Sequence, residues 1–271
     1  MADIPTRIAH IELRVSDVEA SSAFYAQLVG LEPTAVGPDR AELQPPSMNG
    51  GGTPVLILHR AEQPGRAPMR AAGLFHTAFR FRDRAGLAAA LRRVAAEMHH
   101  PLTGVSDHGV SEALYLDDPD GLGIELYRDR PMDEWPENEP GERVHMFTAP
   151  LDLDDLIAAD VDSPVELASR GVDIGHVHLK VADVDAATAF WTDTMGMELM
   201  TKFGSDAAFL AHDGYHHHIG ANTWASRGAP LEPAEGPGLE ALAVASDAGV
   251  EDAVTPDGVR VIAAPHTAAS S

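Results

Sequence analysis

The stretch IAHIELRVSDVEASSAFYAQLVGL, residues 8–31, recurs as IGHVHLKVADVDAATAFWTDTMGM at residues 174–197. Each copy begins with alternating apolar and polar residues, which predicts a strand, and continues with apolar residues at helical spacing. An aspartate stands where each helix would begin and a glycine where it would end, as is typical of helix caps. The repeated unit is therefore a strand followed by a helix and then by further strands, and it occurs in both halves of the chain.

A weaker copy, LFHTAFRFRD, begins at residue 74, and its His76 stands where the strong copies have His10 and His176. A helix pattern follows, and then residues 104–127, GVSDHGVSEALYLDDPDGLGIELY. Two alternating runs in this stretch flank the turn signal DDPDG, which predicts a hairpin. Glu125 lies among apolar neighbours in the second run, and a carboxylate on a buried face must be paired or bound to a cation.

The fourth copy, GLEALAVASD from residue 238, is eroded. It has Glu240 at the histidine position, a short helix pattern over residues 247–254, and Ile262 where the second copy has Glu125. The four copies predict an α+β fold of two domains, each made of paired βαβββ modules, with the fourth module truncated.

The expected domain boundaries follow the repeat. Residues 1–128 would form a first domain that carries a metal site, and residues 173–271 a second, partly degenerate domain. The segment between them, residues 129–172, is acidic and contains prolines, so we expect a linker with a short helix near residues 153–158.

The composition restricts the class of partner. The chain of 271 residues has 42 acidic and 19 basic residues and a formal net charge of −23, so its surface repels nucleic acids and anionic membranes. The first residues lack the plan of a signal peptide and no apolar run could span a bilayer, which predicts a cytoplasmic protein. Such acidity serves solubility, and it is also typical of halophilic proteins. Without cysteine, a metal would have to bind to His, Asp or Glu.

Three residues stand at matching strand positions in the first two modules: His10, His76 and Glu125. Paired modules curl their sheets into one cup, so these side chains would face inward together. Two imidazoles and one carboxylate form the facial triad that suits Fe(II) and related divalent ions. A single histidine in a strand is more often a core residue, but here the position recurs in three modules. The sequence thus predicts a metal site of His10, His76 and Glu125.

These stretches, together with DPDGLGIELYRDRP and YHHHIGANTW, resemble the vicinal oxygen chelate superfamily, which includes glyoxalases, fosfomycin-resistance proteins and extradiol dioxygenases. The resemblance is above all to the catechol 2,3-dioxygenase-like branch and weakens after about residue 226. It implies a metal-dependent enzyme that cleaves a catechol-type aromatic diol with O2. It also implies Fe(II), Mn(II) or another divalent cation at the predicted ligands, and a homodimer or higher homo-oligomer.

The resemblance implies roles for three further residues. Tyr115 precedes Glu125 by ten residues, as a tyrosine does in extradiol enzymes, and His108 matches an upstream His-Gly pair that lies two residues closer here. His59 ends the last strand of the first module, where the family has a third histidine. We expect His59 to act as acid–base and His108 and Tyr115 to orient the substrate. A turn role for His108 and core packing for Tyr115 are the alternatives.

The second half leaves alternatives open. His176, His216, His217 and His218 belong to a half whose last module lacks ligands, which favours a scaffold, a dimer surface or a lid. A second metal site of His176, His216 and Glu240 is the other interpretation. The strand VLILHR of the first module carries no acid, which argues against a glyoxalase I. A metal lyase or isomerase of glyoxalase or epimerase type and a non-catalytic protein that binds a small aromatic molecule are the rival functions.

Overall fold

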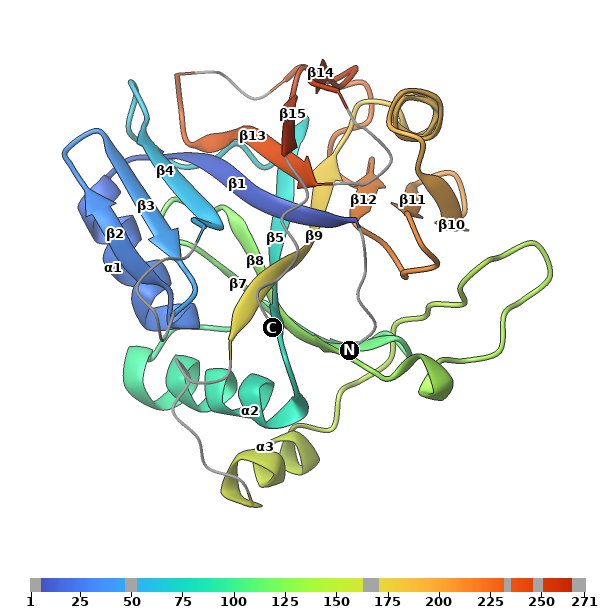
Figure 1. Cartoon of the computed structure of the whole chain (residues 1–271), viewed down its shortest axis with the longest axis horizontal. Helices are drawn as coiled ribbons and strands as arrows, with labels where there is room; N and C mark the ends of the chain where they lie inside the picture. Colours follow the sequence, from blue (N-terminus) through green and yellow to red (C-terminus); the bar gives the residue numbers. More distant parts are fainter. Residues whose placement is uncertain (1–5, 47–52, 163–170, 232–234, 246–250, 265–271) are drawn as a thin grey trace.

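The computed structural model describes residues 6–46, 53–162, 171–231, 235–245 and 251–264 (Figure 1). Their strands form an eight-stranded sheet of order β10-β11-β12-β9-β5-β8-β7-β6 and a seven-stranded sheet of order β14-β15-β13-β1-β4-β3-β2. The predicted α+β class with βαβββ modules is therefore confirmed.

Each of the first three modules has one strand, one helix and three more strands. The first module comprises β1 (Arg7–Val15), α1 (Val18–Val29), β2 (Glu32–Val36), β3 (Arg40–Gln44) and β4 (Leu56–Arg60). The second comprises β5 (Gly73–Phe81), α2 (Arg84–Arg92), the π-helix η1 (Arg93–Met98), β6 (Gly104–Asp107), β7 (Ser111–Asp117) and β8 (Gly123–Asp129). The third comprises β9 (Val172–Lys180), α4 (Val184–Ala189), the π-helix η4 (Phe190–Thr194), β10 (Glu198–Phe203), β11 (Ala207–Ala211) and β12 (Ile219–Asn222).

The fourth module is reduced, as expected. Its described strands are β13 (Gly238–Ala245), β14 (Ala253–Val254) and β15 (Arg260–Ala264). The helix predicted over residues 247–254 falls partly outside the described residues, and its last two residues form β14 instead. Between the second and third modules lie a 3-10 turn, η2 (Met132–Glu134), and α3 (Leu153–Asp162), which packs against α2 (Figure 1).

The helix boundaries follow the capping residues that the repeat predicted. Asp17 accepts a hydrogen bond from Ala20 N at the start of α1, and Asp183 accepts one from Ala186 N at the start of α4. Helix α1 ends at Gly30, whose φ of 75° lies in the left-handed region that glycine adopts without strain.

The modules pair in an order that differs from the expectation. Strand β5 of the second module pairs with β9 of the third, and β1 of the first pairs with β13 of the fourth. The eight-stranded sheet therefore joins the second and third modules, whereas we expected the first to pair with the second and the third with the fourth. Residues 129–172 consequently connect two modules of one sheet.

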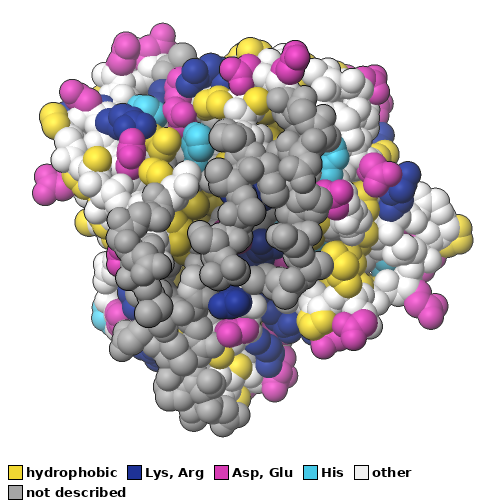
Figure 2. All heavy atoms as spheres, viewed as in Figure 1, with side chains coloured by type: hydrophobic (Ala, Val, Ile, Leu, Met, Phe, Trp, Pro, Cys, Tyr) yellow, Lys and Arg dark blue, Asp and Glu magenta, His cyan; other side chains and the backbone are white. Residues whose placement is uncertain are grey.

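One large apolar cluster draws on all four modules. It contains Tyr25 from α1, Phe79 from β5, Trp191 from η4 and Leu242 from β13, all fully buried. Burying each such side chain contributes about 1.5–3 kcal/mol, so the core fixes the packing between the sheets and their helices. No helix in the described ranges is long and apolar enough to cross a membrane. Acidic side chains are scattered over the face shown in Figure 2 rather than gathered in one patch.

Candidate metal centre

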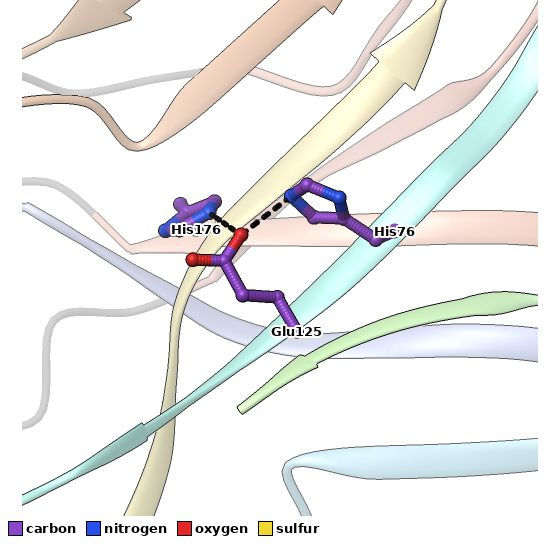
Figure 3. A group of neighbouring side chains, drawn as sticks. All are labelled: His76, Glu125 and His176. Carbon is purple, nitrogen blue, oxygen red and sulfur yellow. Dashed lines mark hydrogen bonds and ion pairs between the residues drawn. The ribbon is translucent and has the colours of Figure 1, made fainter. Parts of the chain in front are cut away.

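Three neighbouring strands in the middle of the eight-stranded sheet each carry one side chain able to bind a metal. They are His176 on β9, His76 on β5 and Glu125 on β8, and their ligand atoms all lie within 4.8 Å of one another (Figure 3). The register explains this, because Ala78 on β5 is the Cα partner of both His176 and Glu125. His76 lies two residues before Ala78 and therefore points to the same face of the sheet.

The three side chains meet at one carboxylate oxygen. The Nε2 atom of His176 hydrogen-bonds Glu125 Oε2 at 3.2 Å, and Nε2 of His76 lies 2.9 Å from the same oxygen. The second contact lacks hydrogen-bond geometry, and this buried Nε2 has no hydrogen-bond partner among the described residues. Ligand atoms bound to one ion at about 2.1 Å and at right angles lie about 3 Å apart. The observed separations therefore fit a bound metal ion.

The protonation states also suit a cation. Burial lowers the pKa of His176 to about 4, so this imidazole is neutral at pH 7. Burial acts to raise the pKa of Glu125, but His176 and His76 outweigh it and hold the pKa well below its usual range. A neutral imidazole and an ionised carboxylate are the forms that bind metals, and the donor set of two histidines and a glutamate suits Fe(II) and related divalent ions.

His10 lies outside this centre, and so does His59. Both are in the seven-stranded sheet, where Nε2 of His10 is 3.6 Å from Glu12 Oε1 and Nε2 of His59 is 2.9 Å from Glu12 Oε2. The expected ligand and the expected acid–base residue thus share one carboxylate away from the centre. Because β5 pairs with β9, the histidine that joins His76 is His176 of the third module.

The alternative site of His176, His216 and Glu240 does not assemble. Glu240 lies on β13 in the other sheet, where its carboxylate accepts a hydrogen bond from Arg14 at 2.6 Å. The pairing of β13 with β1 also skips Glu240, because the register shifts at this point. Leu239 pairs with Leu13 and Ala241 with Glu12. The position that corresponds to His76 is therefore occupied by Ala241.

A pocket of about 470 Å³ opens over the centre and includes His76 and Glu125 in its lining. His108 and Tyr115, which we expected to orient the substrate, also line it. Its aromatic lining residues include Phe75, Phe203, Phe209 and Trp224. A mainly apolar pocket with a few convergent polar groups is typical of a small-molecule site.

The hydrogen bonds of His108 assign its tautomer. Its Nδ1 lies 2.8 Å from the carbonyl oxygen of Phe147, which can only accept, so Nδ1 carries the proton. Its Nε2 lies 2.8 Å from the hydroxyl of Tyr115 and therefore accepts the proton of that hydroxyl. Burial, followed by the nearby charge of Glu125, raises the pKa of Tyr115 well above its usual value, which keeps the hydroxyl protonated.

His217, which was not among the predicted site residues, also lines the pocket, with its ring centroid 4.1 Å from that of His176. Its Nδ1 is 2.8 Å from Nδ1 of His216, and Nε2 of His216 is 2.8 Å from a carboxylate oxygen of Asp129. The carboxylate fixes the proton of His216 on Nε2, so His217 donates from Nδ1 and its own Nε2 is left without a proton. The run of three histidines was the available signal, but only the sheet pairing shows which of them meets the pocket.

Comparisons with known proteins agree with this architecture. The family model described as Glyoxalase/Bleomycin resistance protein/Dioxygenase superfamily matches residues 7–126 and 173–270. Over 237 residues the chain is 38% identical to a catechol-2,3-dioxygenase of Bacillus subtilis (strain 168), covering 87% of this chain and 81% of that protein.

Solved structures share the fold at lower identity. A putative dioxygenase from Bacillus subtilis superposes with a TM-score of 0.55 at 16% identity, over 90% of this chain and 71% of the other. Glyoxalase I from Zea mays superposes with a TM-score of 0.55 at 14% identity, over 94% of this chain and 91% of the other. At these identities the two structures indicate a common fold.

Proposed function

This chain belongs to the glyoxalase/bleomycin resistance protein/dioxygenase superfamily, and we propose that it is an extradiol dioxygenase. It would cleave the ring of a catechol-type diol beside the two hydroxyl groups, with O2 as the oxidant. The observation that carries the proposal is the triad of His76, Glu125 and His176, two members of which, His76 and Glu125, line a pocket that contains further imidazoles and a tyrosine. The relative named catechol-2,3-dioxygenase supports the same chemistry.

We propose His76, Glu125 and His176 as the ligands of a divalent ion, with Fe(II) first and Mn(II) as the next choice. Three protein ligands leave coordination positions open. A divalent ion bound there would supply a centre at which the diol and O2 are held side by side and activated.

Tyr115 and His108 would orient the diol. Tyr115 is the Cα partner of Glu125 in the β7–β8 hairpin, so its side chain lies on the same face as the ligands. The bond from its hydroxyl to Nε2 of His108 holds the phenol oxygen in place, and that oxygen can still accept a hydrogen bond from a substrate hydroxyl. A held hydroxyl beside the reacting oxygens reduces the number of ways in which the diol can bind.

His217 takes the acid–base role that the sequence suggested for His59. A catechol has to lose protons to chelate through two oxygens, and a base in the pocket assists that loss. Nε2 of His217 is the nitrogen without a proton in the chain of contacts from Asp129 through His216. As the proton arrives at Nε2, the Asp129 carboxylate would stabilise the charge that spreads over the two rings.

Reconstitution in the absence of oxygen tests the function. Metal-free protein is loaded with Fe(II), catechol is added, and air is admitted while absorbance and O2 are followed. A yellow ring-fission product with stoichiometric O2 uptake is the expected result. Tight metal binding without O2 uptake across several catechols would instead favour a lyase or isomerase. Protein that binds catechols but no metal would be a binding protein.

A further inference from the structure

We infer that the pocket selects uncharged diols with an apolar substituent and discriminates against diols that carry a carboxylate. This inference rests on the proposed function and names its substrate class. It follows from how the strands of one sheet distribute side chains around the metal centre.

The sheet order separates the floor of the pocket from its walls. The triad lies on β9, β5 and β8 in the middle, whereas Phe203 and Phe209 come from β10 and β11 at one edge. Residues 104–106 of β6 and Tyr115 of β7 come from the opposite edge. A ring bound over the triad would therefore lie between an aromatic wall and a more polar wall.

The aromatic wall continues to the mouth of the pocket. Phe203 and Phe209 are in contact, with centroids 5.0 Å apart, and Phe75 meets Trp224 with centroids 5.5 Å apart. Trp224 is 52% exposed and Phe75 36% exposed, so large apolar surfaces remain beside the opening. An apolar substituent on the diol would cover these rings and gain the free energy of their burial.

The size of the pocket favours more than a single ring. A cavity of about 150 Å³ accommodates benzene, and this pocket measures about 470 Å³. The aromatic wall lines the remaining volume on one side, and residues of β6 and β7 line it on the other. A diol with an aryl or branched alkyl substituent therefore fills the pocket better than catechol does.

The charges in the pocket oppose an anionic substituent. Its carboxylates are Glu125 and Asp117, and no lysine or arginine occurs among its described lining residues. Asp117 on β7 is the Cα partner of Gly123 on β8, and Gly123 is the Cα partner of His76 on β5. This second carboxylate therefore lies two strands away from a ligand, at the same level of the sheet. With the diol oxygens and O2 at the proposed metal, a carboxylate on the substituent would lose hydration without gaining a lysine or arginine partner, and it would meet the like charge of Asp117.

Matched diols test the inference. The probes are catechol, 3-phenylcatechol, 4-tert-butylcatechol, 3,4-dihydroxybenzoate and 3,4-dihydroxyphenylacetate. Both kcat/KM on Fe(II)-loaded protein and anaerobic affinity, from quenching of the tryptophan fluorescence, are measured. We expect the two apolar derivatives to exceed the two carboxylates by at least about tenfold in each, which corresponds to about 1.4 kcal/mol.

Charge variants make the test specific. Thr103 is exposed and lines the mouth, so Thr103→Arg should raise the affinity for the carboxylates about tenfold, and Asp117→Asn should raise it to a smaller extent. Thr34→Arg adds the same charge to an exposed position on β2 of the other sheet and should change nothing.

Equal use of carboxylated and apolar diols by the unmodified protein, or no change in Thr103→Arg, would overturn the inference. If no diol were cleaved, the proposed function would fail, while the order of affinities would still decide how the pocket selects. A preference for apolar diols without cleavage would thus separate the two results.

Discussion

Replacing His176 by alanine should abolish metal binding, whereas replacing His10 by alanine should leave it intact. The two residues stand at the same position of the repeat, but only His176 lies beside Glu125, with its Nε2 at 3.2 Å from the carboxylate. Loss of residues that merely support a ligand costs about 10–100-fold in metal affinity. Loss of the ligand itself should exceed 100-fold, or about 2.7 kcal/mol.

The thermal shift caused by metal measures this loss. At a free metal concentration of 100 Kd, binding stabilises the native protein by about 2.7 kcal/mol. For a chain of this size that corresponds to an increase in Tm of about 5–11 °C. We expect this increase in the unmodified protein and in His10→Ala, and its absence in His176→Ala, with metal content by atomic emission as the second measurement.

The two variants also differ without metal. His176→Ala leaves the carboxylate of Glu125, which is only 3% exposed, without one of its imidazole partners, so the metal-free variant should be destabilised by up to about 3 kcal/mol. His176→Gln, which keeps a side-chain N–H donor there, separates loss of the fold from loss of the ligand. Full metal content in His176→Ala together with its loss in His10→Ala would refute the site and restore the one expected from the sequence.

Three further predictions concern protons and salt. His217→Gln should lower kcat by about 100-fold or more with unchanged metal content, and His59→Gln should leave both unchanged; equal losses in the two variants would contradict the assignment. Burial raises the pKa of Asp118 to about 7, so between about pH 4 and pH 7 the folded state binds more protons than the unfolded state, and the free energy of unfolding decreases as pH rises. Asp118→Asn should remove up to about 3 kcal/mol of this decrease, measured by urea unfolding between pH 4.5 and pH 8, and parallel pH profiles of the variant and the unmodified protein would count against the prediction. With a net charge of −23, Tm should rise with KCl from low ionic strength to about 1 M, where the Debye length is about 3 Å; a flat profile would argue against self-repulsion.

Local patterns were sufficient for the modules and for two of the three residues of the proposed metal centre, His76 and Glu125. Alternation and capping residues predicted the strands and helices, because both are decided within a few residues of the chain. The buried carboxylate of Glu125 indicated a cation before any partner was known. His76 and Glu125 belong to one module, and their relation through the parallel pairing of β5 with β8 is internal to that module.

The pairing of modules could not be derived in the same way. The first and third modules present the same strand pattern, so His10 and His176 satisfy equally well the requirement for a second imidazole. The choice between them depends on long-range contacts between β5 and β9, which no local pattern encodes. His217 was missed for the same reason, since it comes from the third module.

The seven-stranded sheet shows why the described residues contain only one such triad, and the strand register allows a comparison position by position. In the eight-stranded sheet His76 pairs with His178, and Ala78 pairs with His176 and Glu125. In the seven-stranded sheet Ala241 pairs with Glu12, and Ala243 pairs with His10 and Ile262.

His10 thus corresponds to His176 of the other sheet. Ala241 and Ile262 stand at the positions of His76 and Glu125. A hydrogen-bonded pair beside these positions differs as well. His59 and Glu12 bond to each other in the seven-stranded sheet, at the positions where Asn222 and His178 bond in the eight-stranded sheet. The seven-stranded sheet therefore keeps one of the three ligand positions, His10, while its His59 bonds to Glu12 in a pair that the eight-stranded sheet builds from an amide and a histidine. Since one ligand position of three cannot form the triad, the proposed chemistry depends on which modules pair and not on the repeat alone.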